Sequence, residues 1–286
     1  MLGRGQAVRQ RVLVPSCVGS NPAAPAFFAP DITRCALDSL GSYIATVVVL
    51  AAGQGRRMKS DLPKVLHPVC GRPMLSYVMA AAAAVDAGRT VVVLGHGHEQ
   101  VEPHLPAGCV VALQEQQLGT GHAVLSAAEQ ILPGLFLVLA GDTPLITGRI
   151  VRALVDSHRD SGAAATVLTM DLPDPTGYGR VVRDESGDLV KIVEHRDATD
   201  AERQIREVNS GMYILPAPLA LEILAQVGAD NDQGEIYLTD VIAGLRARQE
   251  RVAACKAEDA SLVLGVNSRE ELALAEELMM QRGGQE

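Results

Sequence analysis

A glycine-rich loop with several cationic side chains follows the apolar run TVVVL. The run TVVVL at residues 46–50 leads directly into LAAGQGRRMKSDLPK at residues 50–64. Small residues and glycines let backbone N–H groups approach a phosphate closely, and Arg56, Arg57 and Lys64 add positive charge. A loop of this composition directly after a strand therefore predicts an anion-binding site.

Two better-known phosphate-binding loops share this composition but do not fit the sequence. A dinucleotide fingerprint needs a third glycine where Met58 stands, and an acidic residue after the second strand, where the sequence reads LGH at residues 94–96. A P-loop needs a glycine immediately before its Lys-Ser pair, and Met58 again occupies that place. The loop thus argues against both a dehydrogenase and a P-loop NTPase.

The elements that must position this loop follow a regular alternation. Helical stretches, predicted near residues 73–87, 98–105, 121–131 and 147–160, separate short β-branched runs at residues 46–50, 90–94, 110–113, 135–139 and 165–169. Runs that are apolar on both faces and separated by helices predict a Rossmann-like, doubly wound, mostly parallel α/β sheet. Ligands of such sheets bind beyond the carboxyl ends of the strands, where the glycine-rich loop begins.

The pattern changes after residue 170. Residues 179–195 predict two strands joined by a polar turn that contains Gly187. A further strand is expected at residues 210–215, and helices near 218–226, 238–249 and from about 268. We expect this half to form a smaller, β-rich lobe folded onto the first. The predicted division is an extension at residues 1–43, one domain at 44–268 and a C-terminal helix at 269–286.

Bulk composition excludes several classes of protein. Hydrophobic residues make up 48% of the chain, as in a globular protein. A net charge of −9 argues against binding to nucleic acid or to an anionic membrane surface. The five cysteines are scattered without CxxC spacing, which indicates reduced thiols in the cytosol rather than disulfides or zinc ligands.

Targeting signals are not evident in the sequence. No apolar run approaches the roughly 20 residues that span a bilayer, and the arginines of the N-terminal segment precede no sustained apolar core. We therefore expect a cytoplasmic protein that does not insert into membranes. Residues 1–43 are rich in Pro, Ala, Gly and Ser without periodicity, so we expect them to be disordered or a mis-annotated extension.

A series of motifs in register carries a resemblance to a known family. They are LAAGQGRRM at residues 50–58, LGTGHA at 118–123, GDTPLI at 141–146, PTGYGR at 175–180, IVEHRDA at 192–198, EVNSGMYI at 207–214, QGEIYLTD at 233–240 and GVNSREEL at 265–272. Over residues 46–280 the chain resembles the uridyltransferase domain of the bacterial bifunctional N-acetylglucosamine-1-phosphate uridyltransferase. The resemblance implies a nucleotide-diphospho-sugar transferase fold with a sugar-binding lobe. It also implies Mg²⁺-dependent transfer of UMP from UTP to N-acetylglucosamine 1-phosphate, which yields UDP-N-acetylglucosamine, a cell-wall and lipopolysaccharide precursor, and pyrophosphate.

The same family carries a C-terminal left-handed β-helix of hexapeptide repeats, which transfers acetyl groups and forms a trimer. No hexapeptide pattern occurs in this sequence. The resemblance therefore implies uridyl transfer without acetyl transfer, and we expect a monomer or a weak oligomer.

The resemblance also implies roles for individual residues. Arg57 and Lys64 correspond to catalytic cations, and Asp142 and Asn267 to the Mg²⁺ ligands. The nucleotide-binding positions are Leu50, Ala51, Ala52, Gly53, Lys64, Gln114, Gly119 and Thr120. The substrate-binding positions are Ala140, Gly141, Asp142, Gly179, Glu194, Asn209 and Asn267. Ala140 departs from the family, because many relatives carry an aromatic residue there.

The chemistry implied by the resemblance needs no general base. A phosphate monoester has a second pKa of about 6, so the attacking oxygen of a sugar 1-phosphate is already largely ionised near neutral pH. Catalysis would rest on positioning and on neutralisation of phosphate charge by Lys64, Arg57 and Mg²⁺. Gln114 would read uracil, because a side-chain amide offers both a donor and an acceptor.

Several alternatives remain open on the sequence alone. The reaction could use another sugar phosphate or nucleotide, such as glucose 1-phosphate or dTTP, and the chain could instead be a non-catalytic sensor of UDP-sugars. Glu194 could form a cross-strand pair with Lys191 or Arg196. Asp142 could cap the helix that follows it, although Thr147 could fill that role.

Overall fold

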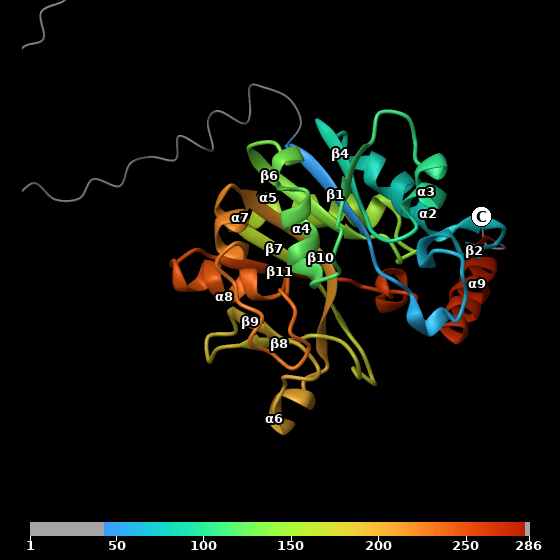
Figure 1. The fold of residues 1–286 in the computed structure, drawn as a ribbon. Helices are drawn as coiled ribbons and strands as arrows, with labels where there is room; N and C mark the ends of the chain where they lie inside the picture. Colours follow the sequence, from blue (N-terminus) through green and yellow to red (C-terminus); the bar gives the residue numbers. More distant parts are fainter. Residues whose placement is uncertain (1–42, 284–286) are drawn as a thin grey trace, which may run out of the picture.

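The computed structural model describes residues 43–283 (Figure 1). The expectations for residues 1–42 and for the last three residues therefore fall outside the described part of the chain. Within residues 43–283, no helix is long and apolar enough to cross a membrane.

One large mixed sheet forms the centre of the structure. The strand order is β11 (Val252–Lys256), β7 (Ala165–Asp171), β10 (Glu207–Ala217), β6 (Gly134–Ala140), β1 (Thr46–Ala51), β4 (Arg89–Leu94) and β5 (Val110–Leu113). β6, β1, β4 and β5 pair in parallel, as do β7 and β11, whereas β10 runs antiparallel to both of its neighbours, β6 and β7. The predicted class, a mostly parallel α/β sheet, is confirmed.

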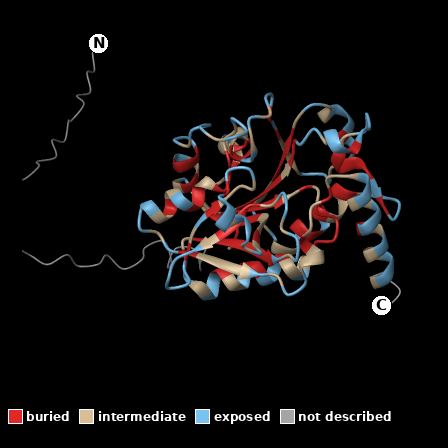
Figure 2. Ribbon diagram, turned by 90° about the horizontal axis from the view of Figure 1, so that it is seen from below, coloured by how far each residue is buried: buried red, intermediate tan, exposed pale blue. Residues whose placement is uncertain are grey.

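Helices cover both faces of this sheet, and strand β1 explains why. Val47, Val48 and Val49 are all fully buried, and successive side chains of a strand point to opposite faces. Val47 and Val49 share a core cluster with helices α2 (Met74–Ala82) and α5 (Gly148–Ser161). Val48 belongs to a second cluster with α4 (Thr120–Ser126), α7 (Leu219–Leu224) and α8 (Asp240–Ala247). Figure 2 shows the buried strands running between the two helical layers.

The second half of the chain does not form a lobe as a whole, so that part of the expectation was wrong. Strand β10 inserts between β6 and β7, and β11 extends the same sheet. The reason is that residues 212–215 of β10 are buried on both faces, which only a central strand can satisfy. The hairpin of β8 (Arg180–Arg183) and β9 (Leu189–Val193) joins this sheet through a short antiparallel pairing of β8 with β10 and, with the short helix α6 (Asp200–Arg203), projects beyond the other strands (Figure 1).

The last helix, α9 (Arg269–Gly283), lies beside a small hairpin that the sequence did not predict. Strands β2 (Pro68–Val69) and β3 (Arg72–Pro73) form this hairpin, and Figure 1 shows α9 next to it. Ala275 of α9 is buried with Val69 and Met74 in a third apolar cluster. The helix α3 (His98–Val101) is also shorter than expected, because it continues as a 3₁₀ turn at Glu102–His104.

Candidate functional site

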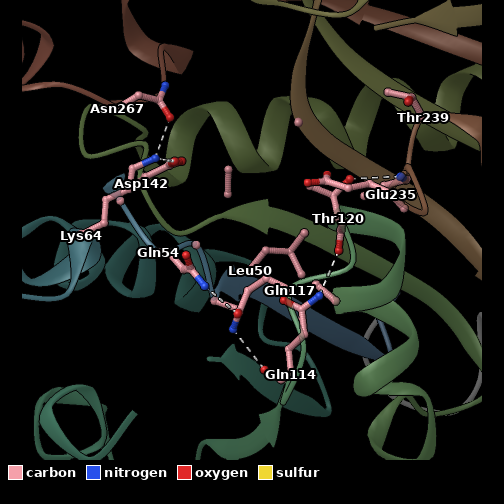
Figure 3. Close-up of a pocket in the computed structure, with 18 of the residues that line it drawn as sticks. Leu50, Gln54, Lys64, Gln114, Gln117, Thr120, Asp142, Glu235, Thr239 and Asn267 are labelled. Carbon is pink, nitrogen blue, oxygen red and sulfur yellow. Dashed lines mark hydrogen bonds and ion pairs between the residues drawn. The ribbon is translucent and has the colours of Figure 1, made fainter. Parts of the chain in front are cut away.

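A cavity of about 640 Å³ opens at the carboxyl ends of β1, β5 and β6 (Figure 3). Its size is that of a site for a small molecule or cofactor. Residues from β10, from the loop after β9 and from the segment before α9 complete its wall. The residues expected at the site that line it are Leu50, Ala52, Gly53, Arg57, Lys64, Gln114, Gly119, Thr120, Ala140, Asp142, Glu194, Asn209 and Asn267.

Three expected residues do not line this cavity but support its wall. Ala51 is buried in the core at the end of β1. The Gly141 N–H donates to the Leu50 carbonyl at 2.9 Å, and a Cβ at Gly141 would lie 2.8 Å from that oxygen. A Cβ at Gly179 would lie 2.9 Å from Ile192 and 3.4 Å from Glu194 Oε1. Both glycines therefore permit close approaches that a side chain would block.

Lys64 joins the two expected metal ligands. Its Nζ donates to Asn267 Oδ1 at 2.7 Å and forms an ion pair with the Asp142 carboxylate, as Figure 3 shows. Lys64 is only 8% exposed, and lysines are rarely buried this far unless an opposite charge pairs with them, as Asp142 does here. Thr147 accepts a hydrogen bond from the Ile150 N–H and caps α5, so Asp142 is not needed as a cap.

The donor set around Lys64 fits a hard divalent cation. Asp142 and Asn267 each direct a side-chain oxygen at the same ammonium nitrogen, so the two oxygens converge. Within residues 43–283 no group of three or more His, Cys, Asp or Glu side chains gathers around a metal-sized space. Two protein oxygens suit Mg²⁺, which keeps several waters and takes further oxygens from substrate phosphates.

Asn267 is held in place by backbone contacts on both sides. The Val266 N–H donates to the Asp142 carbonyl at 2.8 Å. Glu271, in the first turn of α9, accepts hydrogen bonds from the Asn267 and Ser268 N–H groups at 2.5 and 3.2 Å. Ser268 Oγ in turn accepts from the Glu271 N–H at 3.2 Å, a reciprocal capping arrangement that fixes the start of the helix.

Gln114 presents an acceptor rather than a full amide to the cavity. It is buried after β5, and its Nε2 donates to the Gly119 carbonyl at 3.0 Å and lies 3.0 Å from His122 Nδ1. Its Oε1 accepts no hydrogen bond from residues 43–283. We expected the amide to offer a ligand both a donor and an acceptor. Its NH₂ group is already bonded within the protein, so its oxygen is the atom that can bond a ligand N–H.

Gly119–Gly121, the GTG segment after Gln114, packs against the irregular segment before α8. Gly119 has φ +105°, and a Cβ there would lie 2.5 Å from the Ile236 carbonyl oxygen. The Gly121 N–H donates to that same oxygen at 2.8 Å, and Thr120 Oγ1 accepts from the Leu238 N–H at 3.0 Å. Bulk at residue 119 would thus displace the protein's own backbone, whatever ligand is bound.

Hydrogen bonds of Gln54 and Gln117, two residues that the sequence did not single out, hold the tip of the glycine-rich loop. Gln54 Nε2 donates to Gln117 Oε1 at 2.9 Å (Figure 3). Arg56 Nε in turn donates to Gln54 Oε1 at 2.8 Å. Arg57 is exposed at the cavity rim, with no hydrogen bond or ion pair to the described residues. The sequence could have suggested Gln54 and Gln117 only through their positions, since each lies next to residues expected to bind the nucleotide.

Glu194 forms no ion pair with any of residues 43–283, so the alternative of a cross-strand pair with Lys191 or Arg196 is wrong. Lys191 pairs with Glu202 at 2.9 Å, and Arg196 pairs with Asp232 at 3.5 Å. The side chain of Glu194 instead lines the cavity.

Glu194 therefore carries a carboxylate whose charge is poorly compensated. Burial raises its pKa, while a hydrogen bond donated by Thr239 Oγ1 at 3.1 Å lowers it in part, and neighbouring acidic residues raise it further. On β10 an irregularity after Asn209 turns its side chain back, so that Oδ1 accepts from the Gly211 N–H at 2.9 Å. The Tyr213 hydroxyl, also at the cavity wall, is buried without a hydrogen bond to the described residues.

Comparisons with known proteins identify the fold family. The sequence pattern of the MobA-like NTP transferase domain matches residues 47–208, which contain the glycine-rich loop, Gln114, Asp142 and Glu194. The chain belongs to this family. A solved structure of a UDP-glucose pyrophosphorylase with UDP-glucose superposes with a TM-score of 0.67 at 20% identity, covering 84% of this chain and 99% of that one, and shows the same fold.

Among curated relatives, the similarity extends to the bifunctional proteins named GlmU. The protein of Geobacillus thermodenitrificans is 49% identical over 237 residues, which cover 82% of this chain and 52% of the relative. That of Thermobifida fusca is 48% identical over 247 residues, covering 83% and 51%. This NTP transferase chain thus spans about half the length of the curated relatives it matches.

Proposed function

We propose that this NTP transferase transfers UMP from UTP to N-acetylglucosamine 1-phosphate, releasing pyrophosphate. The observation that carries the proposal is the convergence of Lys64, Asp142 and Asn267 at one end of a cavity that also contains the Gln114 oxygen and the Glu194 carboxylate. A cationic and metal-binding end beside acceptors for N–H and O–H groups is what a nucleoside triphosphate and a sugar phosphate together require. Relatives of about 50% identity point to the same chemistry.

The nucleotide would lie along the glycine-rich loop. Gln114 Oε1 would accept the N3–H of uracil, a donor that the cytosine ring lacks. Leu50, Ala52 and Gly53 would border the base and ribose, and the absence of a side chain at the exposed Gly53 lets the backbone approach them. An acceptor at this place would favour a base with a ring N–H, such as uracil or thymine, over cytosine.

The sugar phosphate would lie on the β10 side of the cavity. Glu194 and Asn209 would accept hydrogen bonds from sugar hydroxyls or bind the acetamido group, and Ala140 leaves that wall open. Because the Glu194 carboxylate forms no ion pair within the described part of the chain, hydrogen bonds from hydroxyl groups would compensate its charge. Buried acceptors of this kind discriminate against analogues that lack the matching donor.

The residues of this chain would act on the reaction by position and charge. Lys64 and Arg57 would bind the triphosphate oxygens and hold the α-phosphate in line with the attacking phosphate oxygen. Asp142 and Asn267 would hold Mg²⁺, which when bound neutralises charge on the phosphates. The attacking oxygen is already ionised near neutral pH, so no side chain has to remove a proton.

A substrate panel tests this proposal. Pyrophosphate release is measured with UTP or dTTP and with N-acetylglucosamine 1-phosphate or glucose 1-phosphate, first with Mg²⁺ and then with EDTA. We expect the fastest release from UTP with N-acetylglucosamine 1-phosphate, and none without metal. Faster release with glucose 1-phosphate would contradict the proposed sugar. Binding of UDP-N-acetylglucosamine without any release would contradict catalysis and favour the sensor.

A further inference from the structure

The middle of the glycine-rich loop is tied to the first residue of α9. Arg269 donates from Nε to the Met58 carbonyl at 2.9 Å and from its Nη2 to the Lys59 carbonyl at 3.1 Å. These two carbonyls belong to the last residue and the C-cap of the 3₁₀ turn of Arg56–Met58, which carries Arg57. Lys59 itself has φ +49°, a left-handed backbone that is costly for a residue with a side chain. A strained turn of this kind persists only when its surroundings hold it.

Arg269 is also linked to the metal-binding end of the cavity. It stands two residues after Asn267, whose Oδ1 accepts a hydrogen bond from Lys64 at the far end of the same loop. Ser268 and Glu271 fix the chain between them by reciprocal capping. The start of α9 therefore holds the loop at two points, with Arg269 at its middle and Asn267 at its end.

We propose that Arg269 is a positioning residue, which holds the glycine-rich loop in the conformation that presents Arg57 to a nucleoside triphosphate. Arg269 does not line the cavity and so does not act on the substrate itself. The rigid planar guanidinium holds two donors at a fixed spacing and so fixes two successive carbonyls, whereas the ammonium of a lysine turns freely on a flexible stem. The kinetic consequence of this inference rests on the proposed function, whereas its effect on the loop does not.

Trypsin provides a direct readout of the loop in the free protein. Arg56, Arg57 and Lys59 are exposed cleavage sites within it, and cleavage of a closed loop follows the population that opens. We expect Arg269→Met to raise the rate of cleavage after these residues by about tenfold, the ratio that corresponds to one net hydrogen bond from a charged donor. Mass spectrometry of the fragments separates these cuts from cuts elsewhere in the chain.

A matched control lies on the same helix. Arg282 donates to Asp259 Oδ2 at 2.7 Å and to Ser261 Oγ at 2.8 Å, far along α9 from the loop. Arg282→Met removes the same charge and a similar pair of hydrogen bonds, and should leave cleavage in the loop unchanged. Arg269→Lys can donate to one of the two carbonyls and should restore part of the protection.

Kinetics separate a positioning role from a general loss of stability. With transfer measured as pyrophosphate release, Arg269→Met should raise the KM for UTP about tenfold and leave the KM for the sugar phosphate near that of the parent protein. Unchanged loop cleavage in a folded Arg269→Met protein would overturn the inference, as would a fall in kcat with both KM values unchanged. If Arg269→Met does not fold, equal loop cleavage in Arg269→Lys and the parent protein would overturn it. If the parent protein itself released no pyrophosphate, the proposed function would be refuted, whereas the effect of Arg269 on loop cleavage would still be tested.

Discussion

The close approach at Gly119 gives the most quantitative prediction. We consider Gly119→Ala, which places a methyl group 2.5 Å from the Ile236 carbonyl oxygen on a backbone with φ +105° and ψ 174°. Gly187→Ala is the matched control, because Gly187 has φ +84° with no atom within 4 Å of its would-be Cβ. Both substitutions force a side chain onto a left-handed backbone, but only the first also creates a clash.

The expected cost at residue 119 has two parts. A non-glycine residue in this backbone region costs about 1–3 kcal/mol. Relief of the clash must move Ile236, whose N–H donates to the Leu118 carbonyl and whose carbonyl accepts from Gly121, both at 2.8 Å. Weakening these two hydrogen bonds adds about 1 kcal/mol each. We expect Gly119→Ala to lower the free energy of unfolding by about 3–5 kcal/mol. Gly187→Ala, which carries only the backbone part, should lower it by about 1–3 kcal/mol.

Urea unfolding of the two variants, followed by circular dichroism, measures this difference. Gly119→Ala should also raise the KM for UTP, because the Gly119 carbonyl accepts the hydrogen bond that orients Gln114. Equal destabilisation by the two substitutions would refute the argument, since it would mean that the Ile236 segment yields without cost. A normal KM for UTP in a destabilised Gly119→Ala protein would separate the packing role from the orientation of Gln114.

The charged groups of the cavity give three further expectations. Asp142→Asn should lower turnover on the order of 10²-fold in the pyrophosphate assay, and near-normal activity would remove Asp142 from the metal site. Lys64→Met should tighten Mn²⁺ binding to the nucleotide-free protein about tenfold in an EPR titration, because the ammonium no longer competes for Asp142. The same substitution should lower the rate of pyrophosphate release. An unchanged affinity for Mn²⁺ would contradict the competition. Because the pKa of Glu194 is raised in the folded protein, its contribution to stability is present below the ordinary pKa of 4.5 and is lost as pH rises through the folded pKa. In urea unfolding, Glu194→Gln should therefore stabilise the protein near pH 8 but not near pH 4. Equal effects at the two pH values would contradict the raised pKa.

The sheet could be predicted because its strands carry their own signal. Residues 47–49 and 136–139 are apolar at every position, a pattern that strands buried on both faces require, and the structure buries each of them completely. Strand β11 was missed because its residues are only partly buried at the edge of the sheet, where alternation is weak. The central place of β10 was missed for a different reason: strand order depends on long-range pairing, which local periodicity does not encode.

The candidate site divides along the same line. Parallel strands end at one edge, so topology alone brings the loop after β1 near Asp142 after β6. Asn267, from the far end of the chain, could be assigned only through a resemblance to a family. Neither topology nor the family resemblance could predict which hydrogen bonds and ion pairs each side chain forms. That Gln114 has used its donor depends on His122 and Gly119, and that Glu194 lacks a cation depends on where Lys191 finds Glu202.

The charge state of the cavity follows from these pairings rather than from its composition. Lys64 is the most buried cation of the cavity, and in the free protein Asp142 already neutralises it. A cation alone would have to displace the Lys64 ammonium from Asp142, and a triphosphate alone would have to draw the ammonium away and leave a carboxylate beside phosphate. Each separate step leaves like charges close together, which is costly in a partly buried site. A nucleotide that arrives with its cation replaces both halves of the ion pair at once. Arg56 and Arg57, both exposed at the cavity and without an ion pair among the described residues, are the cations left to attract it. We therefore expect the metal–nucleotide complex to be the species that this NTP transferase binds.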